Sequence, residues 1–279
     1  MNTALLLSGG TGSRIQTDIP KQYIRVAGKM IITYSLETLA NVSSIDRILI
    51  VAAKEWRERI ITDARQHGIC TDKIQGFAVP GSSRQSSILN GLQCIVGRDM
   101  AAGKNDTVCA ATVKNDNCDA AAENDGICDA DRENADVFGA GPENGESYDT
   151  DTVLIHDAAR PMLTETQINA CFAALDSHDG VLPALPMKDT IYLSEDGGQV
   201  TELLDRSKLF AGQAPELFCL KKYYQANIML LPDRINQING STEPAILAGM
   251  DIVMIPGDEG NFKITTNSDM ERFRKLCGM

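Results

Sequence analysis

The sequence predicts an α/β domain in which helices flank a mostly parallel sheet. Short apolar runs alternate along the chain with longer amphipathic segments, the pattern of strands joined by crossover helices. The 279 residues are 43% hydrophobic, which is enough for a single domain over residues 1–279 with one substantial core. The chain contains no uninterrupted apolar run long enough to cross a bilayer, so no membrane span is expected.

The expected elements follow each other in a regular order. The strands are expected at Ala4–Ser8, Arg47–Ala52, Gly76–Val79, Val153–His156, Gly180–Pro183 and Ile252–Ile255. The helices are expected at Ile32–Ala40, Lys54–His67, Gln85–Ile95, Thr164–Ser177, Leu220–Ile228, Glu243–Ala248 and Ser268–Cys277. Ser268 is the expected N-cap of the last helix because its hydroxyl can accept a free backbone N–H.

One stretch interrupts this alternation with the pattern of a β-hairpin. In residues 189–206, Ile191 and Leu193 alternate with polar residues, and an Asp-Gly-Gly turn precedes Val200 and Leu203. We expect an arm over residues 187–207 that projects from the α/β body. A projecting hairpin leaves strand edges exposed, and a second subunit is the usual cover, so the arm predicts a homodimer.

The segment over residues 97–151 has a different composition. Residues 97–150 hold thirteen acidic and four basic residues, a net charge of −9 out of −12 for the whole chain. The segment contains few large apolar residues and repeats Asn-Asp pairs, so we expect a disordered insertion. A zinc site at Cys109, Cys118 and Cys128 or a calcium loop at 129–136 is the alternative, but neither spacing matches its template.

The overall charge and the cysteines limit the function classes. An acidic chain argues against nonspecific nucleic-acid binding, although it permits a small anionic ligand held by local basic residues. The eight cysteines are scattered and include no CxxC pair, and the N-terminus reads as a strand rather than a signal peptide. We therefore expect reduced thiols and a cytoplasmic protein.

A glycine-rich loop follows the first strand, in the stretch "LLLSGGTGSRIQTDIPKQY". It matches neither the P-loop nor the dinucleotide pattern, which would need a third glycine where Ile15 stands. Small residues let backbone N–H groups approach phosphate oxygens, and Arg14 and Lys21 add positive charge. The alternative for Lys21 is a solvated loop lysine. The stretch therefore predicts a site for several negative charges.

A carboxylate is expected at the end of another strand, in "VLIHDAARP". Asp157 would lie at the carboxyl end of a parallel strand, where open α/β sheets bind ligands, and it could hold Mg²⁺. A helix-capping role is the alternative for Asp157. The neighbouring His156 is expected to be packed or hydrogen-bonded rather than catalytic, because it points to the opposite face of the strand.

Three further stretches carry glycine, hydroxyl or basic side chains. "PGSSRQSSILNGL" is a loop that enters a helix, "LLDRSKLFAGQAPELF" carries Arg206, and "PGDEGNFKITTNSDM" carries Lys263. No arrangement of a nucleophile with a catalytic base is apparent in the sequence. Basic groups combined with one metal-binding carboxylate favour phosphoryl or nucleotidyl transfer, where positioning and charge neutralisation provide most of the catalysis.

These five stretches, in this order, resemble the cytidylyltransferases that make CDP-methylerythritol (2-C-methyl-D-erythritol 4-phosphate cytidylyltransferases) and their relatives that make CDP-ribitol. The resemblance runs from about Ala4 to Lys275, apart from the acidic segment. It implies a Rossmann-like nucleotidyltransferase fold with a protruding β-arm, a homodimer, CTP as substrate and Mg²⁺ as the metal.

The resemblance also implies a role for individual residues. Gly10, Gly12, Arg14 and Lys21 would bind the triphosphate of CTP, and Arg14, Lys21 and Lys263 would be the catalytic cations. Gly81, Ser82 and Ser87 would bind cytosine and ribose. Asp157 would bind the metal, and Asp157, Arg160, Thr190 and Arg206 would hold the sugar phosphate, with Arg206 reaching in from the partner's arm.

The sequence departs from the family pattern around the acceptor. "APE" stands where both branches have "TPQ", so Ala214 lacks a hydroxyl and Glu216 adds a negative charge, and "STEP" stands for a later acidic pair, with Glu243 as its stand-in. "HDAARP" and "DR" favour methylerythritol phosphate, whereas "GGTG" and "GQ" favour ribitol phosphate. A non-catalytic nucleotide-binding protein is the hypothesis from another class.

Overall fold

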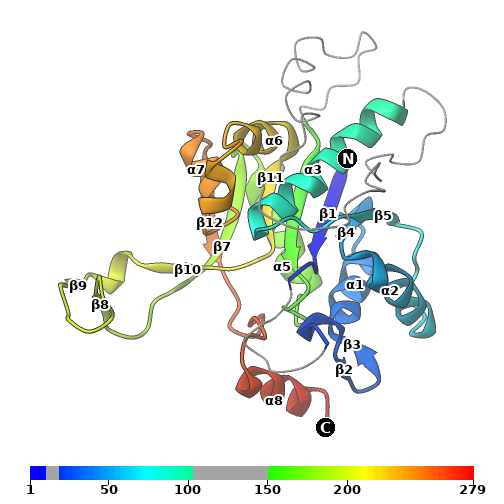
Figure 1. Cartoon of the computed structure of the whole chain (residues 1–279), viewed down its shortest axis with the longest axis horizontal. Coiled ribbons are helices and arrows are strands. Elements are labelled where there is room, and N and C mark those ends of the chain that lie inside the picture. The colour runs from blue at the N-terminus through cyan, green and yellow to red at the C-terminus, as the bar shows by residue number, and fades with distance from the viewer. Residues whose placement is uncertain (11–18, 103–149) are drawn as a thin grey trace, which may run out of the picture.

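The computed structural model describes residues 1–10, 19–102 and 150–279, and it confirms the predicted fold class. Its central sheet has eight strands in the order β10-β7-β11-β6-β1-β4-β5, with β12 paired to β7. Strands β6, β1, β4 and β5 are parallel, as are β7 and β12, whereas β11 runs antiparallel between β6 and β7 (Figure 1). The sheet is therefore mixed but mostly parallel.

The elements have the following bounds. The sheet strands are β1 (Asn2–Leu7), β4 (Arg47–Val51), β5 (Ile74–Ala78), β6 (Thr152–Asp157), β7 (Gly180–Pro186), β10 (Phe210–Gly212), β11 (Glu216–Cys219) and β12 (Ile252–Pro256). Two small ribbons are formed by β2 (Arg25–Val26) with β3 (Lys29–Met30) and by β8 (Ile191–Leu193) with β9 (Glu202–Leu204). The helices are α1 (Ile31–Asn41), α2 (Lys54–Gln66), α3 (Arg84–Ala102), α5 (Glu165–Leu175), α6 (Leu220–Ile228), α7 (Glu243–Leu247) and α8 (Asn267–Leu276). Single 3₁₀ turns occur at Lys21–Tyr23, Arg206–Lys208 and Arg234–Gln237.

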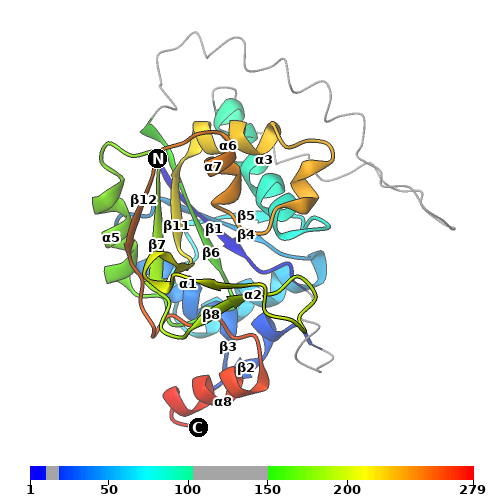
Figure 2. The same ribbon diagram turned by 90° about the vertical axis from the view of Figure 1, so that its left-hand side faces the viewer.

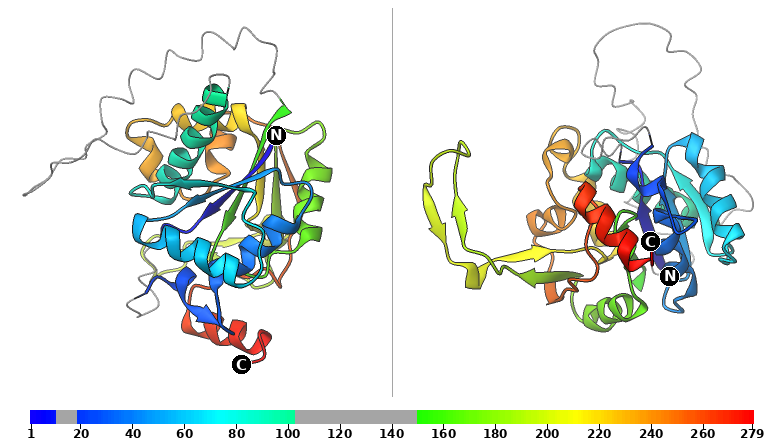
Figure 3. Two further views of the ribbon diagram at one scale, coloured as in Figure 1. Left: turned by 90° about the vertical axis from the view of Figure 1, so that its right-hand side faces the viewer. Right: turned by 90° about the horizontal axis from the view of Figure 1, so that it is seen from below.

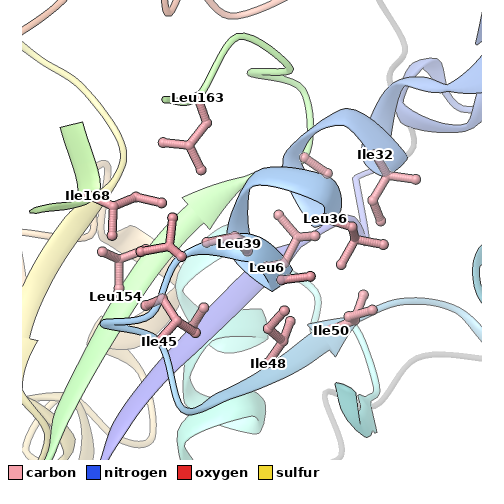
Figure 4. Close-up of a cluster of buried hydrophobic side chains, with 14 of the residues drawn as sticks. Leu6, Ile32, Leu36, Leu39, Ile45, Ile48, Ile50, Leu154, Leu163 and Ile168 are labelled. Carbon is pink, nitrogen blue, oxygen red and sulfur yellow. The ribbon is translucent and has the colours of Figure 1, made fainter. Parts of the chain in front are cut away.

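Helices cover both faces of the sheet, which explains the continuous apolar runs of its central strands (Figure 2). In β1, Ala4 and Leu6 face α1, α2 and α5, whereas Leu5 faces α3 and α6. Figure 4 shows the first of these two cores, in which Leu6, Ile48 and Leu154 from three neighbouring strands meet the side chains of α1 and α5. Burying both faces leaves only the strand ends and the loops that follow them available for a ligand.

The arm and the last helix extend from this body. The β8–β9 hairpin stands away from the sheet in Figure 3, and its turn forms as expected, with Asp196 accepting hydrogen bonds from the N–H groups of Gly198 (2.8 Å) and Gln199 (2.9 Å). Helix α8 packs through Met270 and Phe273 against Val26 and Ile31, which form a separate small core. None of the helices in the described ranges is long and apolar enough to span a membrane.

The structure corrects several expected boundaries. Thr266 rather than Ser268 caps α8, because its hydroxyl accepts the Asp269 N–H (3.2 Å) while the Asp269 carboxylate accepts the Thr266 N–H (2.8 Å). Strands β10 and β11 were not predicted, because each is too short to show a period in its sequence. Helix α3 continues to Ala102, so the first residues of the acidic segment belong to it, and residues 103–149 lie outside the described part of the chain.

Candidate active site

A pocket of about 560 Å³ opens at the carboxyl ends of β1 and β6. These strands are parallel neighbours, and Leu7 at the end of β1 is in register with Asp157 at the end of β6. The pocket is lined by Leu7, Ser8, Gly9, Gly10, Lys21, Gln22, Gly81, Ser82, Ser83, Arg84, Ser87, Asp157, Ala159, Lys263 and Thr265. Five chain segments, two of them from the first 22 residues, therefore meet at the sheet edge predicted for a ligand.

The loop after β1 is tied to the segment that carries Lys21. The buried Gln22 amide donates to the carbonyl oxygens of Ser8 (2.6 Å) and Gly10 (2.8 Å), and the Tyr23 hydroxyl also donates to Ser8 O (2.8 Å). Tyr23 in turn stacks on Trp56 with ring centroids 4.2 Å apart. These contacts fix the 3₁₀ turn that carries Lys21 next to the loop after β1, and Lys21 and Gly10 both line the pocket.

The start of α3 forms the opposite wall of the pocket. Ser83 and Ser86 exchange hydrogen bonds, from Ser83 N to Ser86 Oγ (2.7 Å) and from Ser86 N to Ser83 Oγ (3.1 Å), and Gly81 N donates to Ser87 Oγ (2.9 Å). A Cβ at Gly81 would lie 2.4 Å from Ser86 Oγ, so this close turn requires glycine. The loop thus presents small polar groups and a helix N-terminus to the pocket, a combination suited to anions.

Asp157 is the centre of the charge network. Its Oδ1 accepts hydrogen bonds from Arg84 Nη2 (3.0 Å) and Nε (3.2 Å), and its Oδ2 accepts one from Lys263 Nζ (2.9 Å). Arg160 Nε lies 3.9 Å from the same Oδ2. Although burial alone would raise the pKa of Asp157, these three cations together hold it far below its usual value. Asp157 is therefore ionised throughout the ordinary pH range.

Lys263 is held in place by the segment between β12 and α8. The Asn261 amide donates to the Ala214 carbonyl (2.8 Å), Arg160 Nη1 donates to the Asn261 carbonyl (2.8 Å), and Ile264 N donates to Ala159 O (2.8 Å). Asn261 is fully buried, so these bonds are shielded from water. They fix the backbone on both sides of Lys263 and direct its ammonium group towards Asp157.

His156 confirms the expectation of a packed, hydrogen-bonded histidine. It is completely buried, and its Nε2 donates to the Arg160 carbonyl (3.0 Å), whereas its Nδ1 has no partner. Burial lowers the pKa of His156 to about 4, so the ring is neutral near pH 7.

Glu216 lies behind this network at the start of β11. The side chain is buried, and its carboxylate accepts hydrogen bonds from the hydroxyls of Ser241 and Thr242 (2.9 Å for the latter). Arg84 Nη2 is 3.8 Å from its Oε2. Burial raises the pKa of Glu216 to about 7 against the opposing effect of Arg84. Glu216 is not among the residues that line the pocket, whereas its neighbour Arg84 is.

The structure brings most of the predicted site residues together. Gly10, Lys21, Gly81, Ser82, Ser87, Asp157 and Lys263 line the pocket. Arg160 lies behind Asp157, and its side chain is largely buried. Thr190 and Arg206 are exposed on the arm, where Arg206 Nη1 donates to the Lys188 carbonyl (2.7 Å), and neither lines this pocket. Gly12 and Arg14 fall outside the described residues.

The sequence analysis did not single out Arg84 and Gln22. Both stand inside quoted motifs, "GSSRQSS" and "PKQY", but nothing in the sequence says that Arg84 faces Asp157, which is 73 residues away. Gln22 is buried and acts on the backbone of the loop after β1. Only the packing of α3 and of the 3₁₀ turn against the end of β1 reveals these two roles.

The donor set fits a divalent cation that enters with a phosphate ligand. Among the described residues that line the pocket, Asp157 is the one carboxylate, and the described part of the chain holds no group of three metal-binding side chains. Mg²⁺ commonly takes one or two carboxylates and completes its shell with waters and substrate phosphates. Arg84 and Lys263 donate to the two oxygens of Asp157, so a metal at Asp157 would compete with these cations.

Comparison with known proteins finds a matching family and similar relatives. Residues 3–125 and 144–275 match the family model described as IspD, 2-C-methyl-D-erythritol 4-phosphate cytidylyltransferase. The chain is 28% identical over 277 residues to a 2-C-methyl-D-erythritol 4-phosphate cytidylyltransferase from Lachnospira eligens, covering 97% of this chain and 96% of the relative. It is 25% identical over 282 residues to a ribitol-5-phosphate cytidylyltransferase from Streptococcus agalactiae, covering 99% and 95%.

The fold is similar to that of solved structures. The crystal structure of 4-diphosphocytidyl-2C-methyl-D-erythritol synthase from Anaerococcus prevotii superimposes with a TM-score of 0.68 at 20% identity, covering 100% of this chain and 96% of that one. The 2-C-methyl-D-erythritol 4-phosphate cytidylyltransferase from Francisella tularensis gives a TM-score of 0.67 at 19% identity, covering 98% of each chain.

Proposed function

The chain belongs to the 2-C-methyl-D-erythritol 4-phosphate cytidylyltransferase (IspD) family of CTP-dependent cytidylyltransferases, and we propose that it couples CTP to 2-C-methyl-D-erythritol 4-phosphate, giving CDP-methylerythritol and pyrophosphate. This reaction would place it in isoprenoid precursor synthesis. The observation that carries the proposal is that Lys21, Lys263, Arg84 and Asp157 line one glycine-lined pocket, where Arg84 and Lys263 bond to Asp157. Membership of a family of CTP-dependent cytidylyltransferases speaks for an enzyme and against the hypothesis of a non-catalytic nucleotide-binding protein.

Within this proposal, CTP binds along the β1 loop and the start of α3. Gly10, Gly12, Arg14 and Lys21 hold the triphosphate, and Gly81, Ser82 and Ser87 contact cytosine and ribose. The open backbone of Gly10, where an added Cβ would meet no atom within 4 Å, allows the close approach of a phosphate. The small side chains around Gly81 support a base-binding role because they leave room in the pocket wall.

An oxygen of the acceptor phosphate attacks the α-phosphorus of CTP. The new P–O bond forms as the bond to the bridging oxygen breaks, and pyrophosphate leaves with that oxygen. Arg14, Lys21 and Lys263 neutralise the negative charge that builds on the α-phosphate and on the leaving group. No side chain has to act as a covalent nucleophile, in agreement with the residues present in the pocket.

Asp157 is the proposed ligand of Mg²⁺, and its ionised state near pH 7 suits that role. When bound, Mg²⁺ neutralises and orients the triphosphate.

The acceptor is proposed to bind between Asp157, Arg160, Thr190 and Arg206, with Arg206 supplied by the partner subunit of a homodimer. The arm supports this arrangement because its apolar side chains are exposed. These are Tyr192, Leu193, Val200 and Leu203. A second copy of the chain would bury them and bring Arg206 to the neighbouring pocket.

Ribitol 5-phosphate is the second candidate acceptor. The observation in its favour is the streptococcal ribitol-5-phosphate cytidylyltransferase, which is similar over almost the whole chain. Its identity of 25% is close to the 28% of the methylerythritol relative.

An acceptor panel tests the proposal directly. The purified protein is supplied with CTP, Mg²⁺ and either 2-C-methyl-D-erythritol 4-phosphate, ribitol 5-phosphate or another polyol phosphate, and pyrophosphate release is measured. We expect the highest kcat/KM with the methylerythritol compound, and a CDP-linked product by ³¹P NMR. Preference for ribitol 5-phosphate by tenfold or more would establish the second candidate instead.

Subunit complementation tests the role assigned to the arm. We expect Lys21→Ala and Arg206→Ala each to be nearly inactive as purified dimers. Subunits mixed in equal amounts form hybrids in which one site has Lys21 from one chain and Arg206 from the other, so about a quarter of the wild-type activity should return. A mixture that exchanges subunits without regaining activity would show that Arg206 serves its own chain's site or none.

A further inference from the structure

Arg84 lies between two buried carboxylates from different parts of the fold. Its Nη2 is 3.0 Å from Asp157 Oδ1 and 3.8 Å from Glu216 Oε2. Asp157 faces the pocket, whereas Glu216 lies behind it, on β11. The guanidinium therefore has one bonded anionic partner and a second one that a movement of about 1 Å would bring within hydrogen-bonding distance.

The carboxylate of Glu216 is held in place independently of Arg84. The hydroxyls of Ser241 and Thr242 donate to it, and the Ser241 carbonyl accepts the Tyr223 hydroxyl (2.6 Å). Tyr223 is fully buried and stacks on Phe218 with ring centroids 4.1 Å apart. A buried carboxylate with this support can receive a cation without rearranging its surroundings.

A cation that gives up its bond to Asp157 when a metal binds there needs a second anionic partner. The inference rests on the proposed function in one respect, namely that a divalent cation enters with CTP and binds Asp157. Asp157 accepts hydrogen bonds from Arg84 on Oδ1 and from Lys263 on Oδ2, so an entering metal competes with these two cations for the carboxylate. The backbone on both sides of Lys263 is fixed by buried hydrogen bonds, whereas Arg84 has Glu216 beside it as a second anionic partner. Arg84 is therefore the cation that can move away.

We infer that Glu216 is a positioning residue that receives the Arg84 guanidinium when the metal and the triphosphate take over Asp157. Arg84 then remains beside the pocket as an additional cation for the triphosphate. Without the charge of Glu216, Arg84 stays on Asp157 and competes with the metal.

The test measures CTP binding as a function of Mg²⁺ concentration by titration calorimetry at pH 8, without acceptor, so that no turnover occurs. Glu216→Gln removes the charge but keeps one oxygen acceptor, and its amide NH₂ can donate to whichever of the Ser241 and Thr242 hydroxyls loses its oxygen partner. We expect it to raise the Mg²⁺ concentration for half-maximal CTP binding by about tenfold. Glu165→Gln, an exposed carboxylate on α5, is the matched control and should not change it.

A double-mutant cycle separates this role from a general effect of charge. Arg84→Gln removes the competing cation, so the Mg²⁺ requirement should fall below that of the wild type, whether or not Glu216→Gln folds. Adding Glu216→Gln to Arg84→Gln should then shift the requirement less than twofold. An equal tenfold shift in both backgrounds, or none in either, would overturn the inference.

The outcomes distinguish this inference from the function on which it rests. If the wild type binds CTP independently of Mg²⁺, the metal role of Asp157 fails and the inference fails with it. If the wild type requires Mg²⁺ but neither Glu216→Gln nor Arg84→Gln changes the requirement, only the inference fails.

Discussion

Replacing either Glu216 or His156 with glutamine is expected to reveal a pH dependence of stability that the wild-type protein largely hides. Burial shifts the pKa of these two groups in opposite directions. The pKa of Glu216 rises from 4.5 to about 7, with Arg84, Arg160 and Asp157 as the charged groups around it. The pKa of His156 falls from 6.5 to about 4, with the same three side chains around it. Asp157 stays ionised across this range and contributes no slope.

The signs of the two contributions follow from proton uptake. Between pH 4.5 and 6.5 the folded protein keeps a proton on Glu216 that the unfolded chain loses, so this contribution is present at low pH and is lost as the pH rises through about 7. The unfolded chain instead binds a proton at His156 that the folded protein excludes, so that contribution is present above pH 6.5 and is lost as the pH falls through about 4. The two slopes therefore oppose each other.

The shifts set the size of the effect. Each pKa shift changes the free energy of unfolding by about 3 kcal/mol in total. About 2 kcal/mol of this change develops between pH 4.5 and 6.5. Over that window Glu216→Gln should gain about 2 kcal/mol of unfolding free energy relative to the wild type as the pH rises, and His156→Gln should lose about as much.

Urea unfolding followed by the fluorescence of the single tryptophan, Trp56, measures these free energies at half-unit steps of pH. Differences between variant and wild type cancel the contributions of all other groups. The double variant serves as the control. The difference between its unfolding free energy and that of the wild type should be nearly independent of pH, because the two opposing contributions are both removed. If both single variants run parallel to the wild type within about 0.5 kcal/mol, the burial argument for these two groups is wrong.

Three further outcomes are expected from the proposed site. Lys21→Ala should lower kcat by at least ~10²-fold in the pyrophosphate-release assay, the scale for losing one preorganised charge-stabilising group, and near-normal turnover would refute its catalytic role. Lys263→Ala should cause a loss of similar order, whereas Lys208→Ala, an exposed arm lysine, should cause little, and equal effects would contradict the assignment. Replacing residues 103–149 with a short glycine–serine linker should leave activity largely intact, and collapse of activity or of the fold would reject the view of this segment as a dispensable insertion.

Local sequence patterns were sufficient for much of the fold. The apolar runs of β1, β4 and β6 predicted strands because both faces of each strand are buried, and the turn at Asp196 predicted the hairpin. The glycine loop, Lys21 and Asp157 were recognisable because their chemistry depends on residue type and on their position after a strand.

Two short strands and the N-cap of α8 depended on tertiary structure or on reciprocal hydrogen bonds. Strands β10 and β11 are only three and four residues long, and their pairing with β7 and β6 stabilises them more than any local preference. Thr266 caps α8 because Asp269 completes a reciprocal pair of hydrogen bonds.

The sequence by itself predicted a mostly parallel sheet whose strand ends carry a glycine-rich loop, basic groups and a carboxylate. Only the tertiary structure decided that Arg84, from the start of α3, lies between Asp157 and Glu216, and that Lys263 completes the network. The physical reason is that residue type determines what a side chain can bond, whereas the packing of distant elements determines which groups meet and how deeply they are buried. That burial sets the unusual pKa values of Glu216 and His156.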